Sequence, residues 1–181
     1  MSSTCPFWPD KKVRETHLLF LVPGTVNGNP LTLNFLKELI REPKKGHKTD
    51  YRGYEECVKN KLGDQSTSSC WVLMTRDIIP NSRNKNYEEQ EKLVATHAQG
   101  SSQPYELPKA LEAAIGILIE HVQTGKKLYS VNPSTFTKCQ EKVIEGQRPV
   151  VIGDFTDEGL VVGYCPADQE ERFGVGSSWK L

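Results

Sequence analysis

The first two-thirds of the chain carries apolar residues at helical spacing, interrupted by prolines and glycines. Apolar positions three or four residues apart follow Thr32, a residue suited to cap a helix, and Pro43 ends this pattern. A second, shorter apolar stripe runs through residues 54–62 and stops at Gly63. These patterns predict two short amphipathic helices joined by a polar loop.

Two further helices are predicted in the middle of the chain. Asn86 and Glu89 form a capping-box pattern at the start of a helix over 87–97, and the flexible segment AQGSSQP follows it. The clearest helical pattern covers 108–124, where apolar residues form a continuous stripe that ends at Gly125. This last segment is therefore the best candidate for a buried helix.

Beyond residue 125 the apolar period changes from helical to alternating, which is typical of strands. Strands are predicted there at 135–143, 149–155, 160–165 and 172–180. The turn Thr156-Asp157-Glu158-Gly159 predicts a hairpin, and the apolar runs 17–22 and 70–75 predict two earlier strands. The order of elements favours the α+β class: a mixed sheet with three or four helices on one face and an antiparallel C-terminal meander.

Length and charge bound the domain organisation. A chain of 181 residues fits one α+β domain over 16–181, preceded by a polar, proline-containing N-terminal arm over 1–15. Its 23 Lys and Arg residues balance 23 Asp and Glu residues, which argues against a general nucleic-acid binder. The alternative of a local basic patch stays open for Lys44, Lys45, Lys48 and Arg52.

The cysteines and histidines predict neither a disulfide framework nor a metal site. The five cysteines are scattered and odd in number, and the four histidines show no HxH or HxxxH spacing, so free thiols, no metal and no cofactor are expected. The N-terminal residues lack a signal-peptide pattern, and no apolar run reaches membrane-spanning length. We expect a cytoplasmic protein, or one secreted into a host cytosol without a classical signal peptide, with no nucleic-acid or membrane partner.

The loop 76–86, between a predicted strand and a predicted helix, is the candidate binding site, because rigid elements fix both of its ends. Arg76 and Arg83 are expected to face outward as a clamp for a carboxylate or phosphate, with Ser82 and Asn84 as hydrogen-bond donors. In that case their replacement by alanine weakens binding and leaves stability nearly unchanged. The alternative is that Arg76 pairs with Asp77 and that the asparagines only form turns.

An aromatic residue extends the candidate surface. Tyr105, in the turn YELP, is expected to be exposed beside the loop, where it adds contact energy to a protein interface. The candidate binding residues are thus Arg76, Asp77, Ser82, Arg83, Asn84 and Tyr105.

Catalytic groups are less well indicated. A nucleophilic Cys139 needs a nearby base, and His97 and His121 are the available partners, but no cysteine-hydrolase motif surrounds it. Glu112 is a candidate acid or base that a solvated helix face explains equally well. No catalytic residue is assigned, and whether the chain is an enzyme stays open.

Several long segments resemble one family. The phrases WVLMTRDIIPNSRNKNYEEQEKLV, YELPKALEA, GKKLYSVNPSTFTKCQEKV, VVIGDFTDEGLVV and LVPGTVNGNPLTL resemble an uncharacterised domain family in proteins of amoeba-associated chlamydiae, where it follows an F-box-like segment. An F-box docks a substrate-binding domain onto a host ubiquitin ligase, so the resemblance implies partner recognition and no particular reaction. The CPFWP stub before the first predicted strand is too short for an F-box, and the resemblance therefore does not carry the ligase link to this chain.

The expected function is that of a non-catalytic protein-interaction domain, with the hypothesis that it is a bacterial effector acting on a host protein. The alternative is a small cysteine- or carboxylate-dependent enzyme acting on an anionic substrate. A third hypothesis is an assembly module with exposed strand edges, because a formal net charge of +0 gives little protection against self-association. The oligomeric state stays open.

Overall fold

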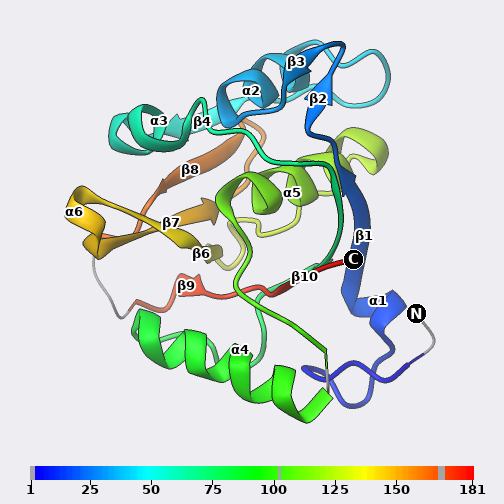
Figure 1. Cartoon of the computed structure of the whole chain (residues 1–181), viewed down its shortest axis with the longest axis vertical. Helices are drawn as coiled ribbons and strands as arrows, with labels where there is room; N and C mark the ends of the chain where they lie inside the picture. Colours follow the sequence, from blue (N-terminus) through cyan, green and yellow to red (C-terminus); the bar gives the residue numbers. More distant parts are fainter. Residues whose placement is uncertain (1–2, 102, 167–169) are drawn as a thin grey trace.

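The computed structural model of the chain describes residues 3–101, 103–166 and 170–181 (Figure 1). The predicted α+β class, with a mixed sheet and antiparallel strands, is confirmed. The helices are α1 (Val13–Thr16), α2 (Leu33–Arg41), α3 (Glu56–Leu62), α4 (Tyr87–Ser101), α5 (Ala110–Thr124) and α6 (Ile144–Gln147). The strands are β1 (His17–Val22), β2 (Thr25–Val26), β3 (Asn29–Pro30), β4 (Tyr51–Tyr54), β5 (Cys70–Thr75), β6 (Phe136–Val143), β7 (Arg148–Gly153), β8 (Leu160–Tyr164), β9 (Phe173–Gly174) and β10 (Ser178–Lys180).

The larger sheet is mixed and has the order β4-β8-β7-β6-β9. Its centre is an antiparallel meander of β6, β7 and β8, and the short strands β4 and β9 join its edges in parallel. The predicted turn over 156–159 connects β7 to β8, and the Thr156 amide donates a 3.0 Å hydrogen bond to the Gly159 carbonyl. The strands of this meander lie close to the ranges that the sequence predicted, although their burial does not alternate strictly.

The smaller sheet is antiparallel, with β5 between β1 and β10. The single strand predicted over 172–180 is wrong, because β9 pairs with β6 in the larger sheet and β10 crosses to β5 in the smaller one. Two threonines hold the connection between the sheets. The Gly176 amide donates to Thr137 Oγ1 (2.8 Å) on the larger sheet, and the Ser177 amide donates to Thr75 Oγ1 (3.1 Å) on the smaller sheet.

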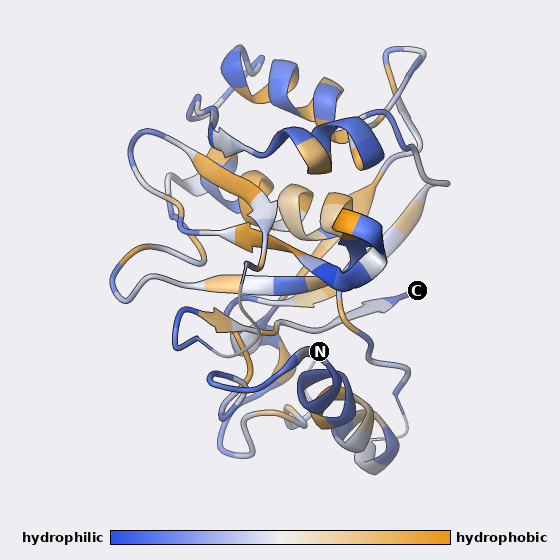
Figure 2. Ribbon diagram, turned by 90° about the vertical axis from the view of Figure 1, so that its left-hand side faces the viewer, coloured by the Kyte–Doolittle hydropathy of each residue, from blue (hydrophilic) through white to orange (hydrophobic). Residues whose placement is uncertain are grey.

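Helix α5 packs against strands of both sheets and forms the centre of the main core (Figure 1). It is apolar around most of its circumference, as its hydropathy colouring shows (Figure 2), and Ile117 is completely buried. Gly116 permits the close approach of the smaller sheet, since a Cβ atom there would lie 2.8 Å from Met74 Cε and 2.9 Å from the Phe20 ring. The sequence prediction of a buried helix is confirmed.

The predicted helix ends are largely confirmed by their hydrogen bonds. Asn86 Oδ1 accepts from the Glu89 amide (2.9 Å), and Glu89 Oε2 accepts from the Asn86 amide (2.8 Å), so the capping box forms. Gly125 ends α5 with a φ of 76°, the left-handed conformation that glycine adopts without strain. Helix α4, however, continues to Ser101 instead of ending at residue 97, because Ala98 packs against apolar residues; residue 102 of the predicted link lies outside the described residues.

The described part of the N-terminal arm packs against the domain. Cys5, Phe7 and Val13 are buried in a second apolar cluster together with residues of β5, α4 and the segment after it. His17, at the start of β1, lies in the same region and is 1% exposed. Its ring stacks on Phe7 with 6.2 Å between ring centroids, so the arm shields one end of the smaller sheet from water.

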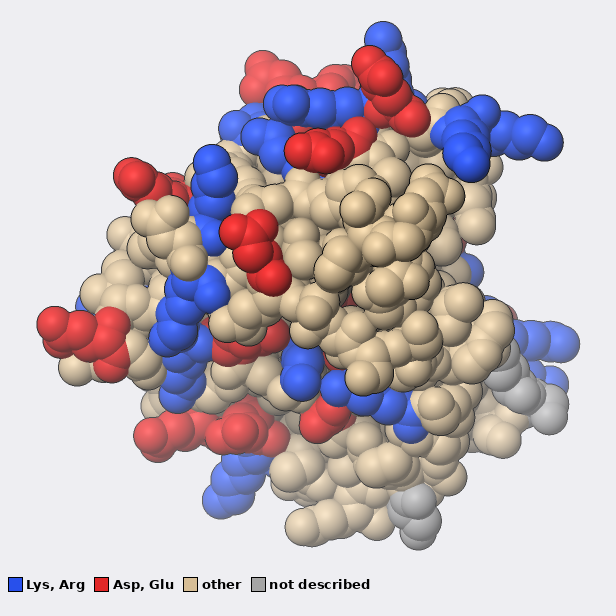
Figure 3. Space-filling model, turned by 45° about the horizontal axis from the view of Figure 1, so that its top comes forward, with Lys and Arg blue, Asp and Glu red and all other residues tan. Residues whose placement is uncertain are grey.

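None of the described helices is both long and apolar enough to cross a membrane. Lysine and arginine side chains lie among aspartate and glutamate side chains over the face shown in Figure 3.

Candidate functional site

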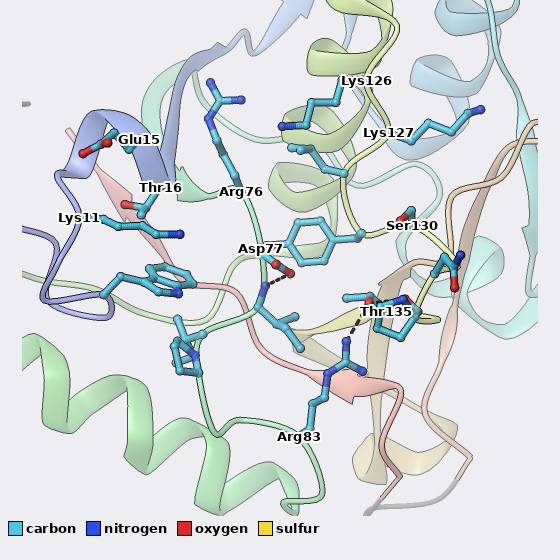
Figure 4. Close-up of a pocket in the computed structure, with 18 of the residues that line it drawn as sticks. Lys11, Glu15, Thr16, Arg76, Asp77, Arg83, Lys126, Lys127, Ser130 and Thr135 are labelled. Atoms are coloured by element: carbon cyan, nitrogen blue, oxygen red, sulfur yellow. Dashed lines mark hydrogen bonds between the residues drawn. The ribbon is translucent and has the colours of Figure 1, made fainter.

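The loop after β5 forms one wall of a cavity of about 790 Å³ (Figure 4). The other walls come from the N-terminal segment 8–16 and from the segment 126–135 that follows α5. A cavity of this volume is in the range of ligand sites. The loop singled out by the sequence therefore does border a hollow, although the arm and the 126–135 segment complete it.

Arg76 is held by groups of the protein itself. Its Nε donates to the carbonyl of His17 (3.1 Å), and its Nη1 donates to Oε1 of Glu120 on α5 (2.5 Å). Glu120 is buried, and the ion pair neutralises the charge of Arg76. The partner is therefore Glu120, so the alternative prediction of an Arg76–Asp77 pair is also wrong.

Arg83 fastens the loop to two distant segments. Its Nη2 donates to Thr135 Oγ1 (2.8 Å), and its Nη1 donates to the carbonyls of Ser134 and Glu171. These acceptors are uncharged, and no ion pair of Arg83 occurs among the described residues. The guanidinium thus keeps its positive charge at the cavity while its hydrogen-bonding capacity is largely used.

The expectation that both guanidinium groups face outward with unused donors is therefore wrong. Sequence reasoning missed their partners because Glu120, Ser134 and Thr135 are distant in the chain. Because both side chains bond to other parts of the protein, we now expect alanine at either position to lower stability.

We expect Arg76→Ala to lower the free energy of unfolding by about 1–2 kcal/mol, because the buried Glu120 carboxylate loses its cation. Urea denaturation of the variant and the wild type measures this loss. In a Glu120→Gln background, Arg76→Ala should lower the free energy of unfolding by less than half of this amount. An equal loss in both backgrounds would show that the ion pair is not the cause.

The other polar residues of the loop have local roles. Asp77 is exposed, lines the cavity, and accepts a hydrogen bond from the Ile78 amide (2.8 Å) through Oδ1. Ser82 is completely buried, and its Oγ accepts from the Val175 amide (3.2 Å), so it is not available to a ligand. Asn84 is exposed with a φ of 55°, a turn conformation, and lies outside the cavity lining.

Tyr105 is buried, contrary to the prediction of an exposed contact residue. Its ring packs edge-on against Phe7 (5.0 Å between centroids) and Trp179 (6.0 Å) in the second apolar cluster. Burial raises the pKa of its hydroxyl to about 12. Tyr105 therefore stabilises the fold and does not border the cavity.

Two lysines that the sequence did not single out project toward the cavity from opposite walls (Figure 4). Lys11 comes from the N-terminal segment and Lys126 from the segment after α5, and neither side chain makes an ion pair within the described part of the chain. The neighbouring Lys127 differs, because it pairs with Asp157. The only sequence signal was a Lys-Lys pair in each segment, and nothing in the sequence showed that the two pairs meet.

The cavity is therefore more cationic than anionic. Lys11, Arg83 and Lys126 have no carboxylate partner among residues that the structure describes, whereas the lining acids are Glu15 and Asp77. Glu15 Oε2 accepts a 2.7 Å hydrogen bond from the Lys12 amide at the start of α1, so part of the hydrogen-bonding capacity of this carboxylate is already used. The arrangement is suited to a ligand with several negative groups.

Tyr129 fixes the wall opposite the loop. It is buried, and its hydroxyl donates to the Thr75 carbonyl (3.0 Å) at the end of β5. Burial raises the pKa of this hydroxyl well above its usual range, so it remains a hydrogen-bond donor. The bond ties segment 126–135 to the strand that leads into the loop, which sets the width of the cavity.

The residues considered for catalysis, Cys139 and Glu112, are buried outside the cavity. Cys139 is completely buried, and desolvation raises the pKa of its thiol well above the ordinary value, the opposite of what a thiolate nucleophile needs. Glu112 is 1% exposed and its Oε1 lies 2.9 Å from Lys180 Nζ. Neither residue lines the cavity, and the recorded ring contacts of His97 and His121 are with other aromatic rings, not with Cys139.

Within the described ranges, no three His, Cys, Asp or Glu side chains are grouped closely enough to hold a metal ion. The chain matches no family model, no curated protein and no solved structure with which it was compared.

Proposed function

We propose that the chain is a non-catalytic protein-interaction domain that recognises an acidic segment of a partner protein. The proposal rests on the cavity of about 790 Å³. It is lined by Lys11, Lys126 and Arg83, and none of these side chains forms an ion pair with a carboxylate of the described residues. Unpaired cations on opposite walls favour a ligand with negative groups spread along its length, since opposite charges across an interface provide specificity and speed association.

The location of the cavity supports a recognition role over a catalytic one. Both lysines are exposed, so a bound segment reaches them without a conformational change in the core. Arg76 and Arg83 donate their hydrogen bonds to groups of the protein itself and so hold the loop in place. The candidate nucleophile Cys139 is buried outside the cavity.

That the partner is a host protein, and the chain a bacterial effector, stays a prediction from the sequence resemblance.

The proposal is tested with fluorescein-labelled decaglutamate as the acidic probe and fluorescence anisotropy as the readout. The double variant Lys11→Gln/Lys126→Gln should bind the probe about two- to thirtyfold more weakly, because each of two exposed ion pairs contributes about 0.2–1 kcal/mol. Its thermal stability should stay close to that of the wild type, since neither side chain has a recorded partner among the described residues.

Lys44→Gln/Lys45→Gln is the matched control, because it removes the same charge from two exposed lysines outside the cavity. Binding by this control should resemble that of the wild type. Equally weakened binding in both double variants would show that binding depends on the overall charge of the protein and not on the cavity.

A further inference from the structure

Strand β1 is an edge of the smaller sheet. The N–H and C=O groups of successive β1 residues point alternately toward β5 and away from the sheet. The Arg76 amide donates to the Thr16 carbonyl (2.8 Å), and on the opposite side of β5 the Leu181 amide donates to the Trp71 carbonyl (3.0 Å). With the register His17 opposite Thr75, this alternation assigns the ladder bonds of β1 to Leu18, Phe20 and Val22. The N–H and C=O groups of Leu19 and Leu21 therefore point away from the sheet.

We call the outward backbone groups of Leu19 and Leu21 the window. The backbone on either side of this window cannot extend the pairing with another strand. At the N-terminal end, the His17 amide donates to the Val13 carbonyl and the His17 carbonyl accepts from Arg76 Nε. At the other end, Pro23 has no N–H. Between them, the outward backbone groups of Leu19 and Leu21 have no hydrogen-bond partner in the described structure.

The side chains of the same window are apolar and exposed. Leu19 is 39% exposed, Leu21 43% and Trp71, which lies opposite Leu21 on β5, 49%. The second apolar cluster covers the other end of this sheet face, where Leu73 is only 4% exposed. An unpaired edge beside bare apolar side chains is a template for another strand.

We propose that β1 pairs with β1 of a second copy of this chain, antiparallel and about a two-fold axis at Phe20. Leu19 of each copy then lies opposite Leu21 of the other as a hydrogen-bonded pair. The four outward groups of each window are all satisfied, and the two sheets become one continuous sheet. The next pair would place His17 opposite Pro23, neither of which has a free N–H, so the ladder ends where the window ends.

A second copy fits better than a charged partner, because residues 17–23 contain no Lys, Arg, Asp or Glu. The four leucines of the two copies would form one apolar patch of two cross-strand pairs, with a Trp71 side chain beside each Leu21. No like charges oppose each other there. A formal net charge of +0 adds no general repulsion. A standard stable interface buries about 800 Å² per partner, more than three side chains and a short edge supply, so the dimer is reversible.

Sedimentation velocity of the full chain over about a hundredfold range of concentration tests the proposal, since dimer formation follows mass action. The wild type and the control Val131→Lys, which adds a charge at another exposed apolar residue, should shift from monomer toward dimer. Leu21→Lys should remain monomeric. Thermal unfolding checks that both variants are folded.

Hydrogen exchange locates the contact independently of any substitution. The amides of Leu19 and Leu21 should exchange rapidly in dilute solution and become protected as the dimer forms, whereas the Phe20 amide, which is bonded to β5, is protected throughout. A wild type that stays monomeric overturns the proposal, even if the edge takes a strand of another protein. A dimer that persists in Leu21→Lys, or that leaves the Leu19 and Leu21 amides unprotected, also overturns it.

Discussion

Replacing Ile117 by alanine should lower the free energy of unfolding by about 2–5 kcal/mol, the range for deleting a buried aliphatic side chain. Ile117 is completely buried on α5, the helix that packs against strands of both sheets. Because neither sheet can collapse into the space without losing its contacts with the helix, we expect little relaxation and a value in the upper half of this range. Urea denaturation followed by circular dichroism measures the change.

The neighbouring Ile119 provides the matched control. It lies on the same helix but is only partly buried, so Ile119→Ala should lower the free energy of unfolding by clearly less than Ile117→Ala. Both variants should unfold in one transition if α5 joins the two sheets into one cooperative unit. Similar losses at both positions, or separate transitions for the two sheets, would contradict the central position of α5.

Acidification from pH 6.5 to pH 4 should remove about 3 kcal/mol of stability through His17 alone, since each unit of pKa difference corresponds to about 1.4 kcal/mol. Desolvation lowers the pKa of His17 from 6.5 to about 4 in the folded state. The ring is buried beside Phe7 and Tyr105, and its Nδ1 lies 2.8 Å from Thr16 Oγ1.

The sign follows from proton binding. Between pH 6.5 and pH 4 the unfolded chain protonates this histidine and the folded chain does not, so the unfolded state gains stability as the pH falls. The contribution of His17 is complete above pH 6.5 and is lost by about pH 4.

His17→Phe isolates this effect, because carboxyl groups titrate in both proteins and their contributions cancel in the difference. Stability measured by urea denaturation at several pH values should fall less steeply below pH 6.5 in the variant than in the wild type. Parallel pH profiles would contradict a depressed histidine pKa as a source of acid sensitivity.

The elements that the sequence predicted correctly are those with local signals. Helix α5 has a continuous apolar stripe and a glycine stop, and the capping box at Asn86 and Glu89 marks the start of α4. Strands β7 and β8 are short runs rich in valine, leucine and isoleucine on the two sides of the turn over 156–159. In each case, residues within a few positions of one another carry most of the information.

The elements that were missed depend on partners that are distant in the chain. Strand β4, Tyr51–Tyr54, lay in a region predicted partly as loop and partly as helix, and it forms because β8 provides a parallel edge more than a hundred residues later. The crossing of β10 to the smaller sheet depends likewise on Thr75 and Thr137. Apolar period alone does not show which sheet a strand joins.

The candidate site shows the same division. The predicted polar loop lies between β5 and α4 in the structure, because a buried strand and a capped helix both have local signals. The sequence did not show that Glu120 neutralises Arg76, that Tyr105 is buried, or that Lys11 and Lys126 line one cavity. Those facts depend on where α5 and the N-terminal segment lie in space.

Titration of the isotope-labelled chain with decaglutamate, followed through the backbone amide resonances in NMR spectra, locates the binding surface. The shifted resonances should belong to residues 8–16, 76–83 and 126–135, the three walls of the cavity. Shifts that cluster on other surfaces, such as the lysines of 44–48, or an equal response to decalysine, would contradict binding of an acidic segment in the cavity.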